Sequence, residues 1–305
     1  MPPSMNSELD EMKCVRVGGK FALSGEHTVL RGGRAILLPT HSASHSVTHS
    51  VTHSVTDVAA DTTDREKTYQ LELQWKHSPN DPTESAESWG ELRPLLERGL
   101  SWLAQERIPV DDLPTLFQLT SSIPAGAGLG SSAALSVAFS RMLLPENLWA
   151  THERRMGQYL EDVFHGKSSG MDVTAVSIGK PILYRSGYDP EIFAIPESFR
   201  FEIIDSGIRS QTSFAIQQVG QRFTAETDQG MREATDLALD GLKTEDASKI
   251  VSSMHKSTEV YEQWGLLTPE LMRQMDVIRK RGALSVRLTG SGLGGHFVAF
   301  YLKVD

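Results

Sequence analysis

The strongest constraint on this chain is a run of small residues, PAGAGLGSSAA, at positions 124–134. Glycine adopts positive φ angles without a steric penalty, so Gly126, Gly128 and Gly130 allow several backbone N–H groups to point into one concavity. An apolar segment that is typical of a strand precedes the run. The residues after it predict a helix over 131–144, whose free N–H groups and dipole attract anions. This order of strand, glycine loop and helix predicts a phosphate-binding loop.

The run differs from the two common phosphate-binding patterns. It lacks the G-x-x-x-x-G-K-[ST] sequence, and Ser131 stands where G-x-G-x-x-G requires its third glycine. The alternative is a glycine-rich turn that only joins two core elements. If the loop binds phosphate, the residues expected to contact it are Pro124, Gly126, Ala127, Gly128, Leu129, Gly130, Ser131 and Ser132.

Length and composition limit the class of protein. A chain of 305 residues with 39% hydrophobic content can bury a full core, as one large domain or two modest ones. The pattern of elements changes near Gly187, which predicts a domain over residues 1–186 that binds nucleotide phosphates and an α+β domain over 187–305. The net charge of −9 argues against a nucleic-acid partner, which usually needs a basic face.

The cysteine count and the hydropathy indicate the compartment. Cys14 is the single cysteine, so an intrachain disulfide is excluded and a reducing environment is expected. No apolar stretch approaches the length of a membrane span, and the first ten residues lack the plan of a signal peptide. We therefore expect a soluble cytoplasmic protein without a membrane partner.

Periodicity and turn residues predict the remaining elements. Strands are expected at 14–25 (with a turn), 34–39, 69–75, 116–119, 181–184, 201–204, 284–288 and 296–302, and helices at 89–105, 131–144, 148–164, 211–221, 226–242, 247–264 and 269–281. Residues 41–56 form a tetrad repeat, HSAS followed by three copies of HSVT. Valine and threonine favour a strand there, and histidines in a line along a strand do not converge on a metal ion. We interpret the repeat as a half-exposed strand or hairpin arm.

Three further clusters are candidates for parts of a functional site. Lys20 begins an apolar strand and is followed by Gly25, Glu26 and His27, although a lone lysine is more often solvated. Asp172 follows the glycine-containing turn HGKSSGM, where it could act in a site or simply cap the next segment. A second glycine loop covers residues 290–295 between two strands, and its four glycines exceed what a hairpin requires. This loop is expected to approach a ligand or the first glycine loop closely.

In order and spacing these clusters resemble the motifs of the GHMP kinases, and within that family the mevalonate kinase branch. The motifs lie at residues 20–36, 124–134, 165–172 and 288–295. The pairing of GEHTV with HGKSSGMD points to that branch more than to the homoserine kinases, although galactokinases also carry a GEH sequence. The chain departs from the pattern at Gly18, Ser291 and Leu293, where the family usually has proline and smaller residues.

The resemblance implies an α+β, two-domain fold, with an N-terminal half like domain 2 of ribosomal protein S5 and a ferredoxin-like C-terminal half. It implies ATP and Mg²⁺ as cofactors, (R)-mevalonate or a similar alcohol as the small-molecule substrate, and a possible homodimer. The roles it implies are Asp172 as catalytic base, Lys20 stabilising developing charge, Ser132 and Glu161 as magnesium ligands, and Glu26, His27 and Thr212 near the acceptor.

Arg185 is a candidate of a different origin. It follows an expected strand, and a guanidinium matches a carboxylate bidentately, so it could clamp the carboxylate of an acceptor; an exposed arginine at a strand end is the alternative. Two other functions stay open at this stage. One is a sister kinase acting on phosphomevalonate, homoserine or a sugar, and the other is a non-catalytic module of the same fold that senses ATP or a metabolite.

Overall fold

The first apolar segment forms two strands, because the chain bends at Gly19. β1 (Cys14–Gly18) and β2 (Lys20–Ser24) flank this glycine and belong to different sheets. A Cβ atom on residue 19 would lie 2.7 Å from the carbonyl oxygen of Leu129, so glycine is required where the chain passes the first glycine loop. The computed structural model describes residues 14–42, 48–52, 70–73, 93–109, 116–121, 123, 126–166, 168–209 and 212–303.

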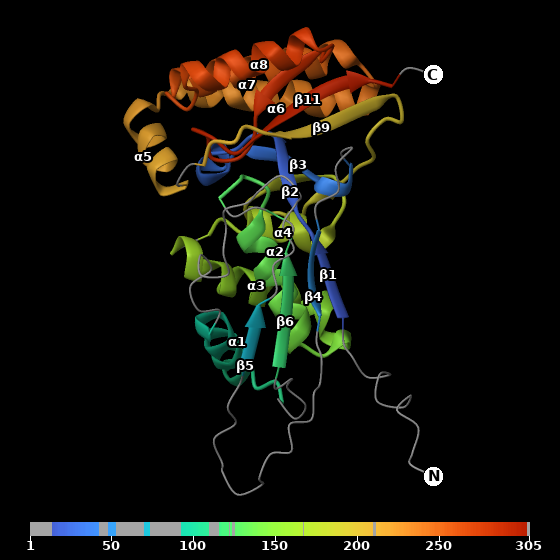
Figure 1. Ribbon diagram of the computed structural model, residues 1–305, viewed down its shortest axis with the longest axis vertical. Coiled ribbons are helices and arrows are strands. Elements are labelled where there is room, and N and C mark those ends of the chain that lie inside the picture. The colour runs from blue at the N-terminus through green and yellow to red at the C-terminus, as the bar shows by residue number, and fades with distance from the viewer. Residues whose placement is uncertain are drawn as a thin grey trace, which may run out of the picture.

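The described strands form three sheets (Figure 1). The first has the order β1-β4-β6-β5 and adds β4 (Thr48–Thr52), β5 (Gln70–Leu73) and β6 (Leu116–Ser121). The second has the order β2-β3-β7-β8 and adds β3 (Arg34–Pro39), β7 (Ile182–Arg185) and β8 (Glu191–Ile192). The third, β10-β11-β9, contains β9 (Phe199–Asp205), β10 (Ser285–Leu288) and β11 (His296–Leu302). Among these described pairs, β5 and β6 are parallel and the others antiparallel.

The helices divide between the two ends of the molecule. The end in the lower part of Figure 1 holds α1 (Arg93–Gln105), α2 (Ser131–Leu143), α3 (Trp149–His165) and α4 (Met171–Ile178). The upper end holds α5 (Thr212–Arg222), α6 (Ala225–Thr244), α7 (Ala247–Gln263) and α8 (Pro269–Lys280). Threonine or aspartate side chains cap the N-termini of α6, α7 and α8, which accounts for where these helices begin. No helix within the described ranges has the length and apolar character needed to span a bilayer.

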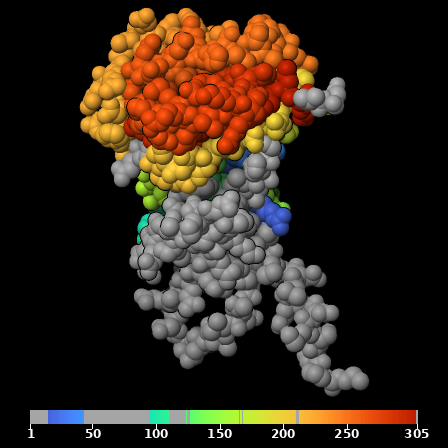
Figure 2. Space-filling view, turned by 45° about the horizontal axis from the view of Figure 1, so that its top comes forward, coloured from blue at the N-terminus to red at the C-terminus, as the bar shows by residue number. Residues whose placement is uncertain are grey.

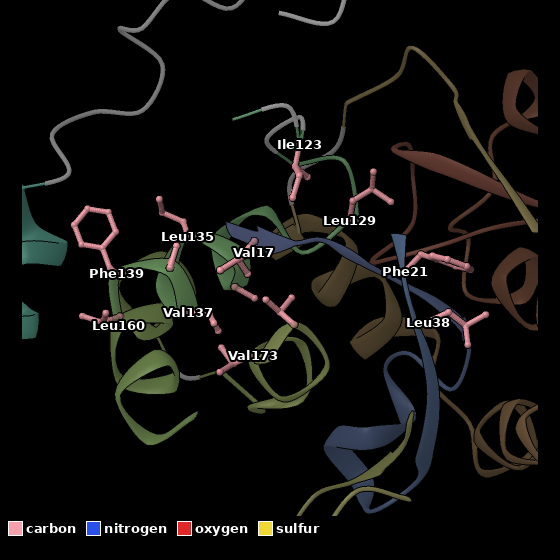
Figure 3. Close-up of a cluster of buried hydrophobic side chains, with 14 of the residues drawn as sticks. Val17, Phe21, Leu38, Ile123, Leu129, Leu135, Val137, Phe139, Leu160 and Val173 are labelled. Atoms are coloured by element: carbon pink, nitrogen blue, oxygen red, sulfur yellow. The ribbon is translucent and has the colours of Figure 1, made fainter. Parts of the chain in front are cut away.

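The largest buried cluster joins the two ends. It includes Val17 of β1 and Leu135 of α2, which Figure 3 shows close to one another, together with Phe201 of β9 and Phe300 of β11. A second cluster lies between the third sheet and helices α5 to α8, and includes Trp264. Figure 2 shows that the C-terminal half, in orange and red, gathers at one end of the molecule. The first cluster extends from α2 to β9. The two glycine loops, which precede α2 and β11, therefore lie at the packed boundary between the two ends of the molecule.

The structure confirms most predicted elements to within a few residues. It adds α4, which the sequence analysis missed because its β-branched, apolar residues show no helical period. Within the tetrad repeat, residues 48–52 form β4, as the strand interpretation predicts, and residues 43–47 and 53–56 lie outside the described residues. The division into domains near residue 187 stays a prediction.

Candidate active site

The first glycine loop ends at the start of α2. Gly126, Gly128 and Gly130 all have positive φ angles, of 64°, 77° and 72°, and Gly130 occupies the N-cap position of the helix. Ser131 and Ser132 form the first turn of α2, so they lie at the positive end of the helix dipole. This geometry fits the predicted phosphate loop. Pro124 lies outside the described residues.

Lys20 and Asp172 lie together beside this loop. The Nζ atom of Lys20 is 3.0 Å from Oδ2 of Asp172, and it lies 3.5 Å from the carbonyl oxygen of Gly128. The backbone N–H of Lys20 donates to the carbonyl oxygen of Leu129 at 2.9 Å. Lys20 is 3% exposed, so the alternative of a solvated lysine is wrong. The lysine therefore connects the phosphate loop to the predicted base.

The second carboxylate oxygen of Asp172, Oδ1, is buried and has no hydrogen-bond partner within the described part of the chain. Asp172 lies in the first turn of α4, after Gly170 in a left-handed conformation. The hydroxyl of Tyr184 donates to the carbonyl oxygen of Ser169 at 2.6 Å and so holds the turn before α4. A buried acceptor of this kind usually has a partner, so Oδ1 is suited to accept a hydrogen bond from a ligand hydroxyl.

Glu161 is a buried acid close to Asp172. It projects from α3, is 2% exposed, and its pKa is raised to about 8, first by burial and then by the charge of Asp172. Although its neighbour Asp162 makes this stretch of α3 look like a solvated acidic surface, Glu161 is therefore a buried residue.

This acid fits the predicted magnesium site in its chemistry. A cation stabilises the ionised form of a carboxylate that is buried beside a second carboxylate. Carboxylate and hydroxyl oxygens are also ligands that Mg²⁺ prefers. Among the described residues, no group of three or more histidine, cysteine, aspartate or glutamate side chains is placed to hold a metal ion by itself. A cation at Glu161 and Ser132 would therefore take its other ligands from water or phosphate.

The second glycine loop packs directly on the first. A Cβ on Gly290 would lie 2.8 Å from the Cα of Gly128, and a Cβ on Gly295 would lie 2.9 Å from the carbonyl oxygen of Ala127. Nδ1 of His296 hydrogen-bonds that same oxygen at 2.8 Å. This contact confirms the expected close approach between the two loops. Leu293, which has a φ angle of 64°, packs against the C-terminal cluster.

Glu26 and His27 face the second glycine loop. Both are buried, and Nη2 of Arg287 donates to both carboxylate oxygens of Glu26, at 2.9 and 3.0 Å. Burial lowers the pKa of His27, and the ring packs edge-on against Trp264. Since a carbonyl oxygen only accepts, Nε2 of His27 carries a proton and donates it to the carbonyl oxygen of Ser291 at 2.9 Å.

Comparison with known proteins identifies the family. The model of the GHMP kinases N terminal domain matches residues 97–180, and the model of the GHMP kinases C terminal matches residues 238–303. The chain belongs to the GHMP kinase family. The first match contains the phosphate loop, Glu161 and Asp172, and the second contains the loop at 290–295.

Relatives and solved structures agree with this assignment. A mevalonate kinase of Aeropyrum pernix is 27% identical over an alignment of 296 residues, which covers 93% of this GHMP kinase and 86% of that protein. The crystal structure of L. major mevalonate kinase in complex with R-mevalonate has a TM-score of 0.71 at 22% identity, covering 99% of this chain and 90% of that one. Streptococcus pneumoniae phosphomevalonate kinase, in complex with phosphomevalonate and AMPPNP, has a TM-score of 0.66 at 16% identity, covering 96% and 93%. These similarities confirm the expected two-domain α+β fold of the GHMP kinases.

Two predicted residues of this GHMP kinase belong to other elements than Lys20 and Asp172. Arg185 comes one residue after Tyr184, so it projects from the opposite face of β7. Its guanidinium stacks on Tyr188, with 4.5 Å between Cζ and the ring centroid, and lines a cavity of about 250 Å³ with Arg34, Arg232 and Asp236. A clamp from Arg185 to the carboxylate of an acceptor stays a prediction. Thr212 is the half-buried first residue of α5, and its role near the acceptor stays a prediction.

Sequence reasoning missed several residues that build the site. Tyr184, Tyr261 and Arg287 all hold backbone groups or acids of the motifs. For Arg287 a signal existed, since a charged residue in an otherwise apolar strand before a glycine loop needs a buried partner. The tyrosines carried no comparable signal, because each resembles an ordinary core aromatic.

Proposed function

We propose that this GHMP kinase is an ATP-dependent mevalonate kinase, which transfers the γ-phosphoryl group of ATP to the 5-hydroxyl of (R)-mevalonate. The observation that carries the proposal is the pair of Lys20 and Asp172 beside the phosphate loop, with 3.0 Å between Nζ and Oδ2. The relative from Aeropyrum pernix, aligned over most of both chains, is named for this activity. The cytoplasmic location and the homodimer stay predictions.

Asp172 and Lys20 have separate roles in the phosphoryl transfer. The substrate hydroxyl donates to Oδ1 of Asp172, while the Lys20 ammonium holds Oδ2. The hydroxyl oxygen forms a bond to the γ-phosphorus, and the bond from that phosphorus to the β–γ bridging oxygen breaks, so that ADP leaves with the electron pair. Asp172 receives the hydroxyl proton. Lys20 stabilises the negative charge on the oxygens, because phosphoryl transfer depends chiefly on positioning and charge neutralisation.

Backbone groups of the first glycine loop and the start of α2 bind the phosphates. Ser132 and Glu161 are the residues that would hold Mg²⁺, which neutralises phosphate charge when it is bound with the nucleotide. Glu161 is buried close to Asp172, so a cation held there would favour the ionised form of both acids.

The nature of the acceptor is the part of the proposal that the fold alone leaves open. The phosphomevalonate kinase from Streptococcus pneumoniae has nearly the same TM-score as the mevalonate kinase from L. major. An assay of purified protein with ATP, Mg²⁺ and one of (R)-mevalonate, phosphomevalonate, homoserine or galactose distinguishes these activities by ADP release. We expect (R)-mevalonate to give the highest kcat/KM, and preference for another acceptor would overturn the assignment.

A substitution tests the predicted base on the same substrate. Asp172→Asn keeps the size of the side chain but removes the charge that accepts the proton. We expect kcat to fall by about 10²–10⁴-fold, the usual contribution of a general base. Near-normal turnover by this variant would refute the role of Asp172 without affecting the choice of acceptor.

A further inference from the structure

A buried polar cluster lies behind the second glycine loop, outside the lysine–aspartate pair. Arg287 of β10 is 1% exposed, and its guanidinium binds both carboxylate oxygens of Glu26 and the carbonyl oxygen of Leu23. Its Cζ also lies 5.0 Å from the ring centroid of Tyr261, a buried residue of α7. Removing two charges from water is costly unless further hydrogen bonds satisfy them. The two terminal nitrogens of Arg287 have such bonds, and its Nε has no partner among the described residues.

The cluster binds both backbone polar groups of Gly290, its N–H and its carbonyl oxygen. Oε1 of Glu26 accepts a hydrogen bond from the backbone N–H of Gly290 at 3.3 Å. The hydroxyl of Tyr261 donates to the carbonyl oxygen of Gly290 at 2.6 Å. The side chain of Thr289 also binds both the N–H and the carbonyl of Ala22, which fixes the residue before Gly290 to β2. Little freedom is left for Gly290 to shift.

The position of Gly290 determines the position of the phosphate loop. The backbones of Gly290 and Gly128 are in direct contact, and a Cβ on either residue would lie within 3.0 Å of a backbone atom of the other loop. Closely packed backbone transmits displacement, because it has no flexible side chain to absorb it. A shift of Gly290 toward the loop therefore has to move Gly128, and a shift away opens a gap beneath it.

We propose that Glu26, Arg287 and Tyr261 form a clamp that positions the two glycine loops for the nucleotide phosphates. They act as positioning residues, and Glu26 serves the nucleotide side of the site and not the acceptor. The proposal rests on the proposed function only in taking ATP as the nucleotide. It predicts that damage to the clamp weakens nucleotide binding and leaves acceptor binding and the chemical step nearly intact.

Tyr261→Phe tests the clamp with the smallest change, since it removes one hydroxyl and keeps the buried ring. We expect the dissociation constant of AMP-PNP with Mg²⁺, measured by calorimetry, and the KM for ATP to rise about threefold to tenfold, as the loss of one hydrogen bond predicts. The kcat and the KM for mevalonate should stay within about twofold of wild type. Tyr301→Phe, at a partly exposed tyrosine of β11, is the matched control. An unchanged nucleotide affinity in Tyr261→Phe would overturn the proposal, as would a rise confined to the KM for mevalonate.

Arg287→Lys supplies a second test. The lysine keeps a positive charge beside Glu26, so the acid is not left buried without a partner. It loses the hydrogen bonds that the guanidinium donates to both carboxylate oxygens. If both residues act through Gly290, Arg287→Lys weakens AMP-PNP binding less in the Tyr261→Phe background than in wild type. Strictly additive effects would contradict a shared clamp. Because calorimetry needs no acceptor, a protein that binds nucleotide but fails to phosphorylate mevalonate would refute the proposed function and leave this test valid.

Discussion

Asp172 directs one carboxylate oxygen to the Lys20 ammonium, 3.0 Å away, and keeps the other buried without a partner among the described residues. The pair thus separates two tasks within one carboxylate. Oδ2 orients the side chain and connects it to the phosphate loop through the lysine, while Oδ1 stays available to a substrate hydroxyl. Each oxygen therefore has a separate task.

The first prediction concerns this lysine. Lys20→Met keeps the aliphatic chain that packs against Gly130 and removes the charge near the phosphates. We expect kcat to fall about 10²–10³-fold, which is typical of losing one preorganised charge-stabilising donor. The rate is measured under saturating ATP and mevalonate, and circular dichroism checks the fold. Lys243→Met, at an exposed lysine of α6, is the control, and equal losses in both variants would argue against a catalytic role for Lys20.

The second prediction separates stability from activity at Glu161. Because burial and the charge of Asp172 raise the pKa of Glu161 to about 8, folding at neutral pH has to bring a proton to this acid, and Glu161→Gln removes that cost. We therefore expect the thermal midpoint of the nucleotide-free, magnesium-free protein to rise, while the magnesium-dependent rate falls. Differential scanning calorimetry and a magnesium titration of the rate measure the two effects. Glu259→Gln, at an exposed position of α7, should change neither; a lower midpoint for Glu161→Gln would contradict the account.

The local parts of this site could be predicted from the sequence. Glycines at 126, 128 and 130 require positive φ angles, and the following serines begin a helix, so the loop and α2 follow from short-range chemistry. Similarity to the GHMP kinases added Lys20 and Asp172. What brings them together is the packing of α4 beside β2 and β3, and tertiary contacts of this kind have no signal in local periodicity.

The parts that could not be predicted depend on pairs far apart in the chain. Glu26 is bound by Arg287, and Glu161 is buried because α3 packs on α2 and α4, so neither environment is visible in its neighbours. Arg185 shows the opposite case. Strand alternation alone sets its side chain on the face of β7 opposite Tyr184, so this orientation could be predicted from the sequence.

The third prediction uses two glycines to isolate the contact between the loops. Gly128 and Gly187 have similar φ angles, 77° and 82°, but a Cβ meets the carbonyl oxygen of Thr289 at 3.0 Å in the first and open space in the second. Gly187→Ala should cost only the left-handed penalty, about 1–2 kcal/mol of unfolding free energy. Gly128→Ala should cost more and also weaken ATP binding. Urea unfolding and calorimetry with AMP-PNP measure both, and equal costs would show that the loops are not tightly packed.

The fourth prediction concerns pH. Burial lowers the pKa of both His27 and His296 from the ordinary value of 6.5. Below that value the unfolded chain binds protons at these rings while the folded chain resists them, so the unfolding free energy falls as the pH drops under about 6.5 and is insensitive to these rings above it. Urea unfolding between pH 5 and 8 measures the slope. His296→Asn should reduce the slope on the acid side, and His255→Gln, at an exposed histidine of α7, should leave it unchanged. A slope that His296→Asn does not alter would mean that this ring binds protons equally in the folded and unfolded states, and it would then be charged beside Ala127 at acid pH and change the field at the first glycine loop.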